Sequence, residues 1–286
     1  MSGGAIRPRS AIEIVDAAVS LYRDNFKTMA IIGLAASAPL VIAAIAGVGM
    51  MARPNAAAML SNPLAIVPGM LLFAAIFVLW FAVIDGAMTF AAAEAYHGRH
   101  PTPADAIRGV ANKGLSLVGG NLLRMLIVGG AAGVAALIVA VAGQASGFLA
   151  FILGVIVLVL AAHLIARTFA ITSAIVLENQ SAVEGVSRSF FLSKDATLRI
   201  IGVAMLCLVI YWIAQLISVM IVQLLVQFVV KNPMVAAVLG NLAGMVIYPF
   251  LNIAIMVLYY DQRVRKEGYD LDVMSGAIGA PAVPRS

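Results

Sequence analysis

The residues of this sequence that are best suited to chemistry are three charged side chains within long apolar stretches or directly beside one, namely Asp85, Arg124 and Arg167. Charged groups are costly to place in hydrocarbon, so inside a membrane segment they commonly mark an ion pair, a ligand site or a transport pathway. All three lie roughly 8 to 11 residues, or about 12 to 16 Å, from the ends of their expected helices that adjoin basic loops. We therefore expect them to form one layer.

Three interpretations of this layer are open at the level of sequence. In the first, Asp85 pairs with one arginine, and the other arginine holds an anionic lipid headgroup in a pocket between helices. In the second, the helices extend beyond the bilayer, and all three charges lie at the interface as snorkelling side chains or a structural ion pair. The apolar residues beyond the charges number about 17 to 21, enough to cross the hydrocarbon alone, which favours the second interpretation. The third interpretation is a transport pathway.

The remaining residues predict no catalytic, cofactor-binding or metal site. His163 has no acidic residue on its own helical turn, and His97 and His100 lack the further ligands that a metal site needs. Cys207 is the only cysteine, which excludes an internal disulfide. No phosphate-binding loop, zinc-protease motif or nucleophile elbow occurs. We therefore expect a protein without enzymatic activity.

Composition places the protein in the membrane class. Of its 286 residues, 63% are hydrophobic and only 11% are charged, and the mean hydropathy is +1.05. Soluble domains carry about 25% charged residues, so an ordinary water-soluble core is excluded. The net charge of +5 comes from basic residues between apolar stretches rather than from one basic face, so nucleic acid is not an expected partner.

Long apolar stretches define the expected fold, because about 20 residues of helix cross a bilayer and lipid tolerates only backbone whose polar groups are bonded internally. Six such stretches occur, at 28–50, 64–93, 125–141, 147–177, 200–230 and 235–260. The sequence therefore predicts an all-α polytopic membrane protein with six transmembrane helices.

Lysine and arginine are distributed unevenly between alternate connections. Sixteen of the 18 lie on one side, fifteen of them in the two terminal segments and the connections that follow the second and fourth stretches, and Arg167 within the fourth stretch near its end on that side. Only Arg53 and Lys231 lie on the other side. Because short cytoplasmic loops are enriched in positive charge, both termini are expected in the cytoplasm.

Three segments on that side begin in the same way, with a hydroxyl residue followed three positions later by an acidic residue. The pairs are Ser10 with Glu13, Thr102 with Asp105, and Ser181 with Glu184. This spacing is typical of a helix N-terminus, where the hydroxyl caps a backbone N–H and the acid faces the positive end of the helix dipole. An amphipathic stretch and two apolar stretches follow each pair, which indicates three repeats of an interfacial helix and a transmembrane hairpin. The alternative is that unrelated helix starts share such caps.

The predicted repeats cover residues 10–96, 102–180 and 181–266 within one integral membrane domain, 1–271. Residues 272–286 are rich in small side chains and contain two prolines, so we expect a disordered C-terminal tail. Just before this tail, Arg263, Arg265 and Lys266 are expected to lie beside the membrane and attract anionic lipid.

Four motifs resemble a known family. They are DAAVSLYRDNF at 16–26, YHGRHPTPADAIRG at 96–109, VLENQSAVEGVSRSF at 176–190 and LYYDQRVRKEGYDL at 258–271. Together they are similar to the membrane domain attached to some bacterial glycerophosphoryl diester phosphodiesterases, which implies a bacterial inner-membrane protein. Relatives often carry proline in the fourth span, whereas Ser173 stands here at such a position, so this helix is expected to be straighter. The soluble catalytic barrel of such enzymes has no counterpart, and no catalytic residue carries over.

These observations favour a non-enzymatic membrane protein that acts as a scaffold or accessory in the cytoplasmic membrane. The expected partners are membrane lipids, anionic ones in particular, with a partner protein or a second copy of the chain as further partners. One alternative is a lipid or small-solute transporter that uses the layer of Asp85, Arg124 and Arg167. Another is the membrane subunit of a separately encoded enzyme.

Overall fold

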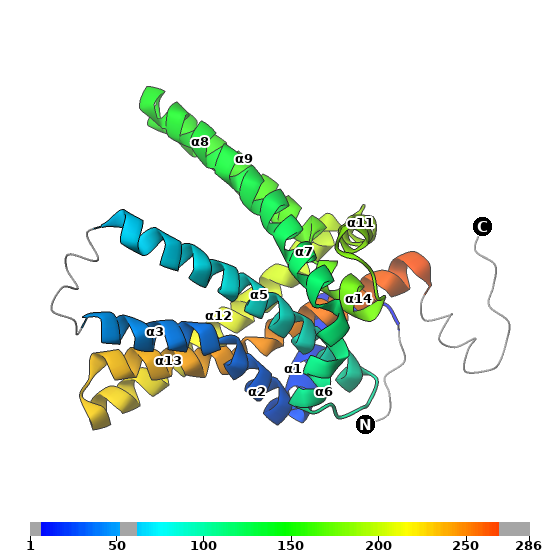
Figure 1. Cartoon of the computed structure of the whole chain (residues 1–286). Coiled ribbons are helices and arrows are strands. Elements are labelled where there is room, and N and C mark those ends of the chain that lie inside the picture. Colours follow the sequence, from blue (N-terminus) through cyan, green and yellow to red (C-terminus); the bar gives the residue numbers. More distant parts are fainter. Residues whose placement is uncertain (1–6, 52–61, 269–286) are drawn as a thin grey trace.

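The computed structural model describes residues 7–51 and 62–268, and every element within those ranges is a helix (Figure 1). Arg53 and the predicted tail at 272–286 lie outside the described residues. The α-helices are α1 (Ala11–Asp24), α2 (Phe26–Ala36), α3 (Ala38–Met51), α5 (Pro63–Tyr96), α6 (Pro103–Val110), α7 (Gly114–Arg124), α8 (Gly130–Ala145), α9 (Gly147–Arg167), α10 (Ile171–Leu177), α11 (Ala182–Ser193), α12 (Thr197–Val230), α13 (Pro233–Ile247) and α14 (Pro249–Glu267). A 3₁₀ turn, η1 (Ala111–Lys113), precedes α7, and a π-helix, η2 (Met125–Gly129), joins α7 to α8.

The predicted all-α polytopic fold is confirmed for the described residues. Five helical segments are long and apolar enough to cross a membrane, and a sixth is obtained when α2 and α3, bent by 40°, count as one span. Their positions match the six stretches expected from hydropathy. The third is longer than expected, because helix extends back to Pro103 through α6 and α7.

All three predicted capping boxes are present. The hydroxyl of each capping residue accepts a hydrogen bond from the backbone N–H three positions later, and the acid accepts one from the N–H of the capping residue. In the first box, the backbone N–H of Ser10 and the Arg7 guanidinium lower the pKa of Glu13 to about 2. The capped helices are α1, α6 and α11, and each precedes long apolar helices.

Several spans are interrupted, and side chains donate hydrogen bonds to backbone carbonyls near the interruptions. These bonds add to the backbone hydrogen bonds in a region where unpaired backbone groups would be costly in hydrocarbon. The fourth span has a turn at 168–170 between α9 and α10, although it contains no proline. The bonds run from Ser37 Oγ to Leu34 O (2.6 Å), from Trp80 Nε1 to Ala35 O (2.9 Å), from Tyr22 OH to Val246 O (2.7 Å) and from Thr168 Oγ1 to Leu164 O (2.9 Å).

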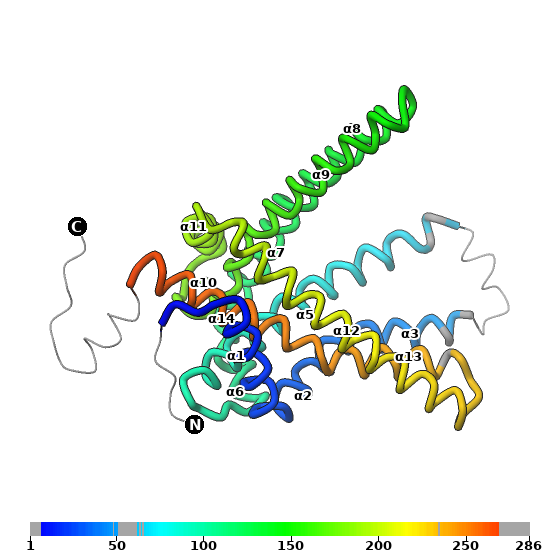
Figure 2. The backbone as a smooth tube through the Cα atoms, turned by 180° about the vertical axis from the view of Figure 1, so that it is seen from behind, coloured from blue at the N-terminus to red at the C-terminus, as the bar shows by residue number. Residues whose placement is uncertain are grey.

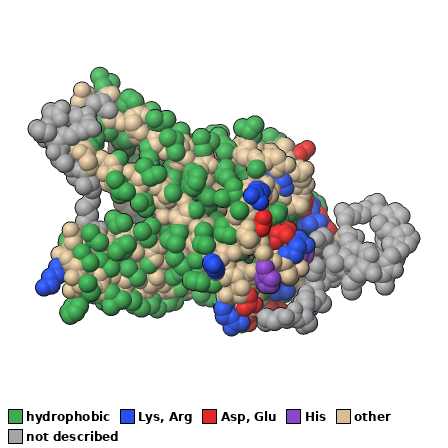
Figure 3. Space-filling view, turned by 60° about the horizontal axis from the view of Figure 1, so that its bottom comes forward, with side chains coloured by type: hydrophobic (Ala, Val, Ile, Leu, Met, Phe, Trp, Pro, Cys, Tyr) green, Lys and Arg blue, Asp and Glu red, His purple; other side chains and the backbone are tan. Residues whose placement is uncertain are grey.

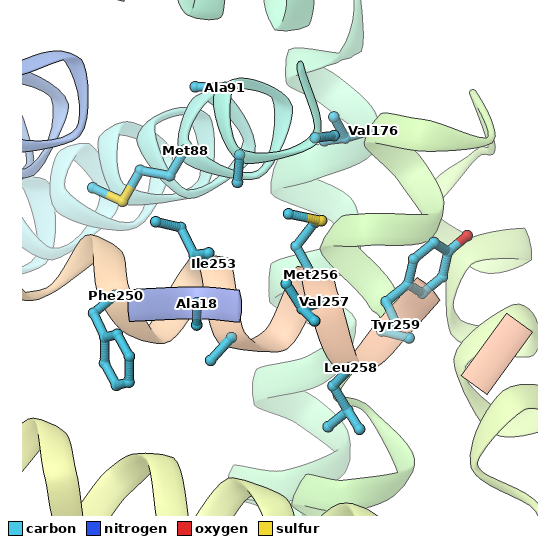
Figure 4. Packing of buried hydrophobic residues seen from close by; sticks show 14 of the residues in the cluster. Ala18, Met88, Ala91, Val176, Phe250, Ile253, Met256, Val257, Leu258 and Tyr259 are labelled. Carbon is cyan, nitrogen blue, oxygen red and sulfur yellow. The ribbon is translucent and has the colours of Figure 1, made fainter. Parts of the chain in front are cut away.

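The buried core lies at one end of the molecule, which we call the base. The base consists of α1, α2, α6, α7, α10, α11 and α14 with the adjoining ends of α5 and α12 (Figure 2). Helix α14 runs through its centre, and most of its residues are buried. Met256 and Tyr259 of α14 are fully enclosed, as is Met88 of α5, and Ala18 of α1 packs in the same cluster (Figure 4).

The α8–α9 hairpin, by contrast, diverges from the other long helices (Figure 1). No residue of α8 is buried, and in α9 only Ala166 is. Hydrophobic side chains cover the long helices, whereas charged side chains gather around the base (Figure 3). The hairpin is therefore tied to the rest of the chain only near the base, and its remaining surface suits contact with lipid.

The close approach of α2 to the junction of α13 and α14 gives a first prediction. A Cβ atom at Gly33 would lie 2.5 Å from the carbonyl oxygen of Met245 and 2.9 Å from Cγ of Pro249. We expect Gly33→Ala to lower the free energy of unfolding by about 1 to 3 kcal/mol, because backbone must move to admit the methyl group. Thermal unfolding in detergent measures this. Gly133→Ala is the control, since nothing lies within 4 Å of its Cβ position; equal losses in both variants would contradict the prediction.

Candidate functional site

Two of the three predicted site residues come together through a side chain that the sequence analysis did not select. The hydroxyl of Thr172 in α10 donates a hydrogen bond to Asp85 Oδ2 of α5 (2.9 Å). The Thr172 hydroxyl oxygen also accepts a hydrogen bond from Nη2 of Arg124, the last residue of α7 (3.2 Å). Among the described residues Asp85 and Arg124 form no direct ion pair, so Thr172 is the link between them.

Arg167 does not join this link. Its guanidinium carbon lies 4.7 Å from the centre of the Phe190 ring, a cation–π contact with α11. Its backbone carbonyl accepts a hydrogen bond from Ser189 Oγ (2.8 Å). Arg167 therefore anchors the end of α9 to α11, and the structure brings together two members of the predicted layer.

An apolar pocket of about 620 Å³ opens beside Arg124. It lies where the hairpin leaves the base, with η2 and the end of α9 on one side and α12 and α14 on the other. Arg124 is the only charged residue of the described chain that lines it. The hydroxyl of Thr168, which also lines the pocket, already donates to carbonyls of its own helix. The pocket therefore offers a hydrophobic volume with one cation at its edge.

Arg124 has unused hydrogen-bonding capacity in this position. Of its N–H groups, only Nη2 has a hydrogen-bond partner among the described residues. Nε is shielded from solvent and finds no acceptor within the described part of the chain. A buried donor of a charged group without an acceptor costs more than an ordinary lost hydrogen bond. An anion that accepts from this guanidinium would remove that cost.

The depth of Arg124 suits a lipid headgroup. Helical residues from Arg124 to the end of α8 at Ala145 span about 30 Å at 1.5 Å per residue, close to the thickness of bilayer hydrocarbon. When the tip of the hairpin lies at one face of the hydrocarbon, Arg124 lies at the other. The pocket then extends from headgroup depth into the acyl-chain region.

Two ion clusters in the base were not predicted from the sequence. In the Glu178 cluster, Arg188 and Arg263 pair with Glu178 and Glu267, and the Tyr259 hydroxyl donates to Glu178. Arg188 Nε lies 2.7 Å from Glu178 Oε2, and Arg263 Nε lies 3.2 Å from Glu267 Oε2. These four charged side chains are at most 17% exposed, so the cluster is a nearly buried link between α10, α11 and α14.

In the Asp261 cluster, one fully enclosed carboxylate joins three parts of the chain. Asp261 of α14 accepts hydrogen bonds from the Arg9 backbone N–H (2.7 Å), from Arg199 Nη2 of α12 (2.7 Å) and from Arg265 Nε (3.0 Å). Both arginines also donate to the Arg9 carbonyl. Arg265 and Arg263, expected to attract lipid, are thus engaged within the protein.

The histidines occupy separate places. His163 is exposed on α9, His97 Nε2 lies 3.3 Å from the Tyr260 hydroxyl, and burial together with Arg99 lowers the pKa of His97. His100 Nδ1 lies 3.4 Å from Asn25 Oδ1. Residues 7–51 and 62–268 contain no group of three or more His, Cys, Asp or Glu side chains that could hold a metal ion.

No family model, curated protein or solved structure matches this chain. The resemblance of its motifs to the membrane domain of bacterial glycerophosphoryl diester phosphodiesterases therefore stays a prediction.

Proposed function

We propose that this protein is a non-enzymatic integral membrane protein that binds an anionic membrane lipid and thereby organises lipid around it as a scaffold or accessory. One acyl chain fills the pocket, and the headgroup phosphate accepts hydrogen bonds from Arg124. The observation that carries the proposal is the shielded Nε of Arg124, which has no acceptor among the described residues and lies at the edge of an apolar pocket.

The apolar part of the pocket explains chain binding but not selectivity. Its volume of about 620 Å³ is in the range of small-molecule sites. A chain that moves there from the bilayer gains little, because lipid tails are as apolar as the pocket wall. Selectivity must therefore come from the headgroup, and charge-assisted hydrogen bonds from a guanidinium to a phosphate are strong and directional.

The predicted topology fits an inner-leaflet lipid. With both termini in the cytoplasm, the base faces the cytoplasm and Arg124 lies at the depth of inner-leaflet headgroups. Anionic lipids are concentrated at cytoplasmic membrane surfaces. The proposal therefore places the bound lipid in the cytoplasmic leaflet of the inner membrane.

Native mass spectrometry of protein extracted gently from its own membrane tests the proposal. We expect the wild type to carry an anionic phospholipid and Arg124→Gln to lose most of it, a decrease of about tenfold or more in occupancy, since hydrogen bonds to charged groups contribute about 1.5 to 3 kcal/mol. Arg167→Gln is the matched control, because Arg167 is expected at similar depth, at the end of α9, but does not line the pocket. Retention by Arg124→Gln, or equal loss in both variants, would contradict the proposal.

A further inference from the structure

Thr172 occupies an unusual position between two opposite charges. It accepts a hydrogen bond from Arg124 and donates one to Asp85, so a single hydroxyl group separates a guanidinium from a carboxylate. Opposite charges in a poorly solvated region attract each other strongly at contact distance. Direct pairing would nevertheless draw Arg124 toward Asp85, which does not line the pocket.

Asp85 is therefore a competitor of any anion in the pocket. The carboxylate and a bound phosphate would both accept hydrogen bonds from the same guanidinium. The hydroxyl of Thr172 satisfies Asp85 Oδ2 without using the guanidinium, and it holds Nη2 while Nε has no acceptor in the described chain. Without this hydroxyl both charged groups would lose a partner, and direct pairing would be the least costly replacement.

We propose that Thr172 is a positioning residue, which keeps Arg124 apart from Asp85 and so leaves its guanidinium available to the phosphate of a bound lipid. This inference rests on the proposed lipid-binding function and names the residues that regulate it. Thr172 contacts no lipid in this scheme. It acts by holding Arg124, and the interaction that it prevents is direct pairing of Arg124 with Asp85.

The test measures binding of phosphatidylglycerol to purified protein by native mass spectrometry over a series of lipid concentrations. Diacylglycerol with the same acyl chains is the neutral comparison, since it fills the pocket without a phosphate. Thr172→Val removes the hydroxyl at nearly constant shape, and we expect it to weaken phosphatidylglycerol binding about tenfold or more with diacylglycerol binding unchanged. Thr172→Ser keeps the hydroxyl and should bind as the wild type does.

The decisive variant is the double substitution Thr172→Val/Asp85→Asn. It removes the competing carboxylate, so Arg124 returns to the pocket and phosphatidylglycerol binding recovers. A merely structural role for Thr172 would not produce this recovery, because the second substitution adds a further change to the same place. Asp85→Asn alone should bind at least as well as the wild type. Thr172→Ala, with the same expected loss, replaces Thr172→Val if thermal unfolding shows that the latter does not fold.

The outcomes separate the two proposals. Wild-type binding by Thr172→Val, or loss without recovery in the double variant, would overturn the positioning role while the lipid site stands. Wild-type binding by Arg124→Gln would overturn the lipid site itself and the positioning role with it. Loss in Thr172→Val that is confined to phosphatidylglycerol and reversed by Asp85→Asn supports both.

Discussion

Replacing Asp261 with asparagine is expected to lower the free energy of unfolding by about 3 kcal/mol, one of the two largest effects of a single substitution in this chain. The Asp261 side chain is 0% exposed and accepts from Arg199, Arg265 and the backbone of Arg9. Asparagine removes the negative charge and leaves two guanidinium groups facing a neutral amide. Arg199 and Arg265 are about one-third exposed, at 31% and 35%, so water compensates in part for the lost carboxylate. The expected loss of stability is therefore at the lower end of the range for breaking a buried ion pair.

Thermal unfolding of the purified protein in one detergent measures this loss. Asp24→Asn is the control, because Asp24 is 39% exposed and its contact with Arg23 is long at 3.4 Å; such surface pairs contribute about 0 to 1 kcal/mol. The Asp261 cluster also fastens the segment before α1, so trypsin should cleave after Arg9 faster in Asp261→Asn than in the wild type. Equal stability of the two variants together with unchanged cleavage would show that the carboxylate contributes little.

The helices could be predicted from the sequence because a bilayer limits the backbone conformations that an apolar stretch can adopt. Apolar stretches of sufficient length must be helical in lipid, and hydroxyl–acid pairs three residues apart have a clear local meaning at a helix start. The capping boxes at Ser10, Thr102 and Ser181 depend only on neighbouring residues, and all three are found. The capping residues and the lengths of the apolar stretches thus explain why the helices could be predicted from the sequence.

The candidate site could be predicted only in part, because its geometry depends on how the helices are rotated relative to one another. The depth of Asp85, Arg124 and Arg167 follows from residue counts, but the faces on which they lie do not. The interruption at 168–170 and the π-helix η2 change the direction of side chains near the layer, and neither has a proline signal. Thr172 looked like an ordinary small residue in an apolar stretch, and only the packing of α10 between α5 and α7 reveals its two contacts.

The Glu178 and Asp261 clusters could not be predicted from the sequence either, because they too depend on how distant helices pack. Arg263, Arg265 and Lys266 form a basic group beside an apolar stretch, a pattern typical of residues that face lipid headgroups. The structure instead turns Arg265 toward Asp261, Arg263 toward Glu267, and Lys266 toward the Phe191 carbonyl. Acidic partners that lie far away in the sequence, such as Glu178, cannot be assigned without knowing that α10 and α11 pack on α14.

The Glu178 cluster leads to the second large effect. Its two acids and two arginines balance in charge, and Arg188 contacts Glu178 through Nε (2.7 Å) and Nη2 (2.8 Å). Glu178→Gln leaves two arginines to share Glu267, and Arg188→Gln leaves two carboxylates to share Arg263. Since all these side chains are at most 17% exposed, each single substitution should cost about 3 kcal/mol of unfolding free energy.

The double variant Glu178→Gln/Arg188→Gln distinguishes a charge-balanced cluster from a set of independent contacts. It leaves Glu267 paired with Arg263 at 3.2 Å, so no charge lacks a partner of opposite sign. We therefore expect the double variant to be at least as stable as either single variant, with a coupling free energy of about 3 kcal/mol or more in a double-mutant cycle of unfolding measurements. Losses that add within about 0.5 kcal/mol would mean that the two side chains act separately. Coupling of the expected size would show that the charges at 178, 188, 263 and 267 act as one unit, which holds the α10–α11 connection on α14 and thereby supports the helix that carries Thr172.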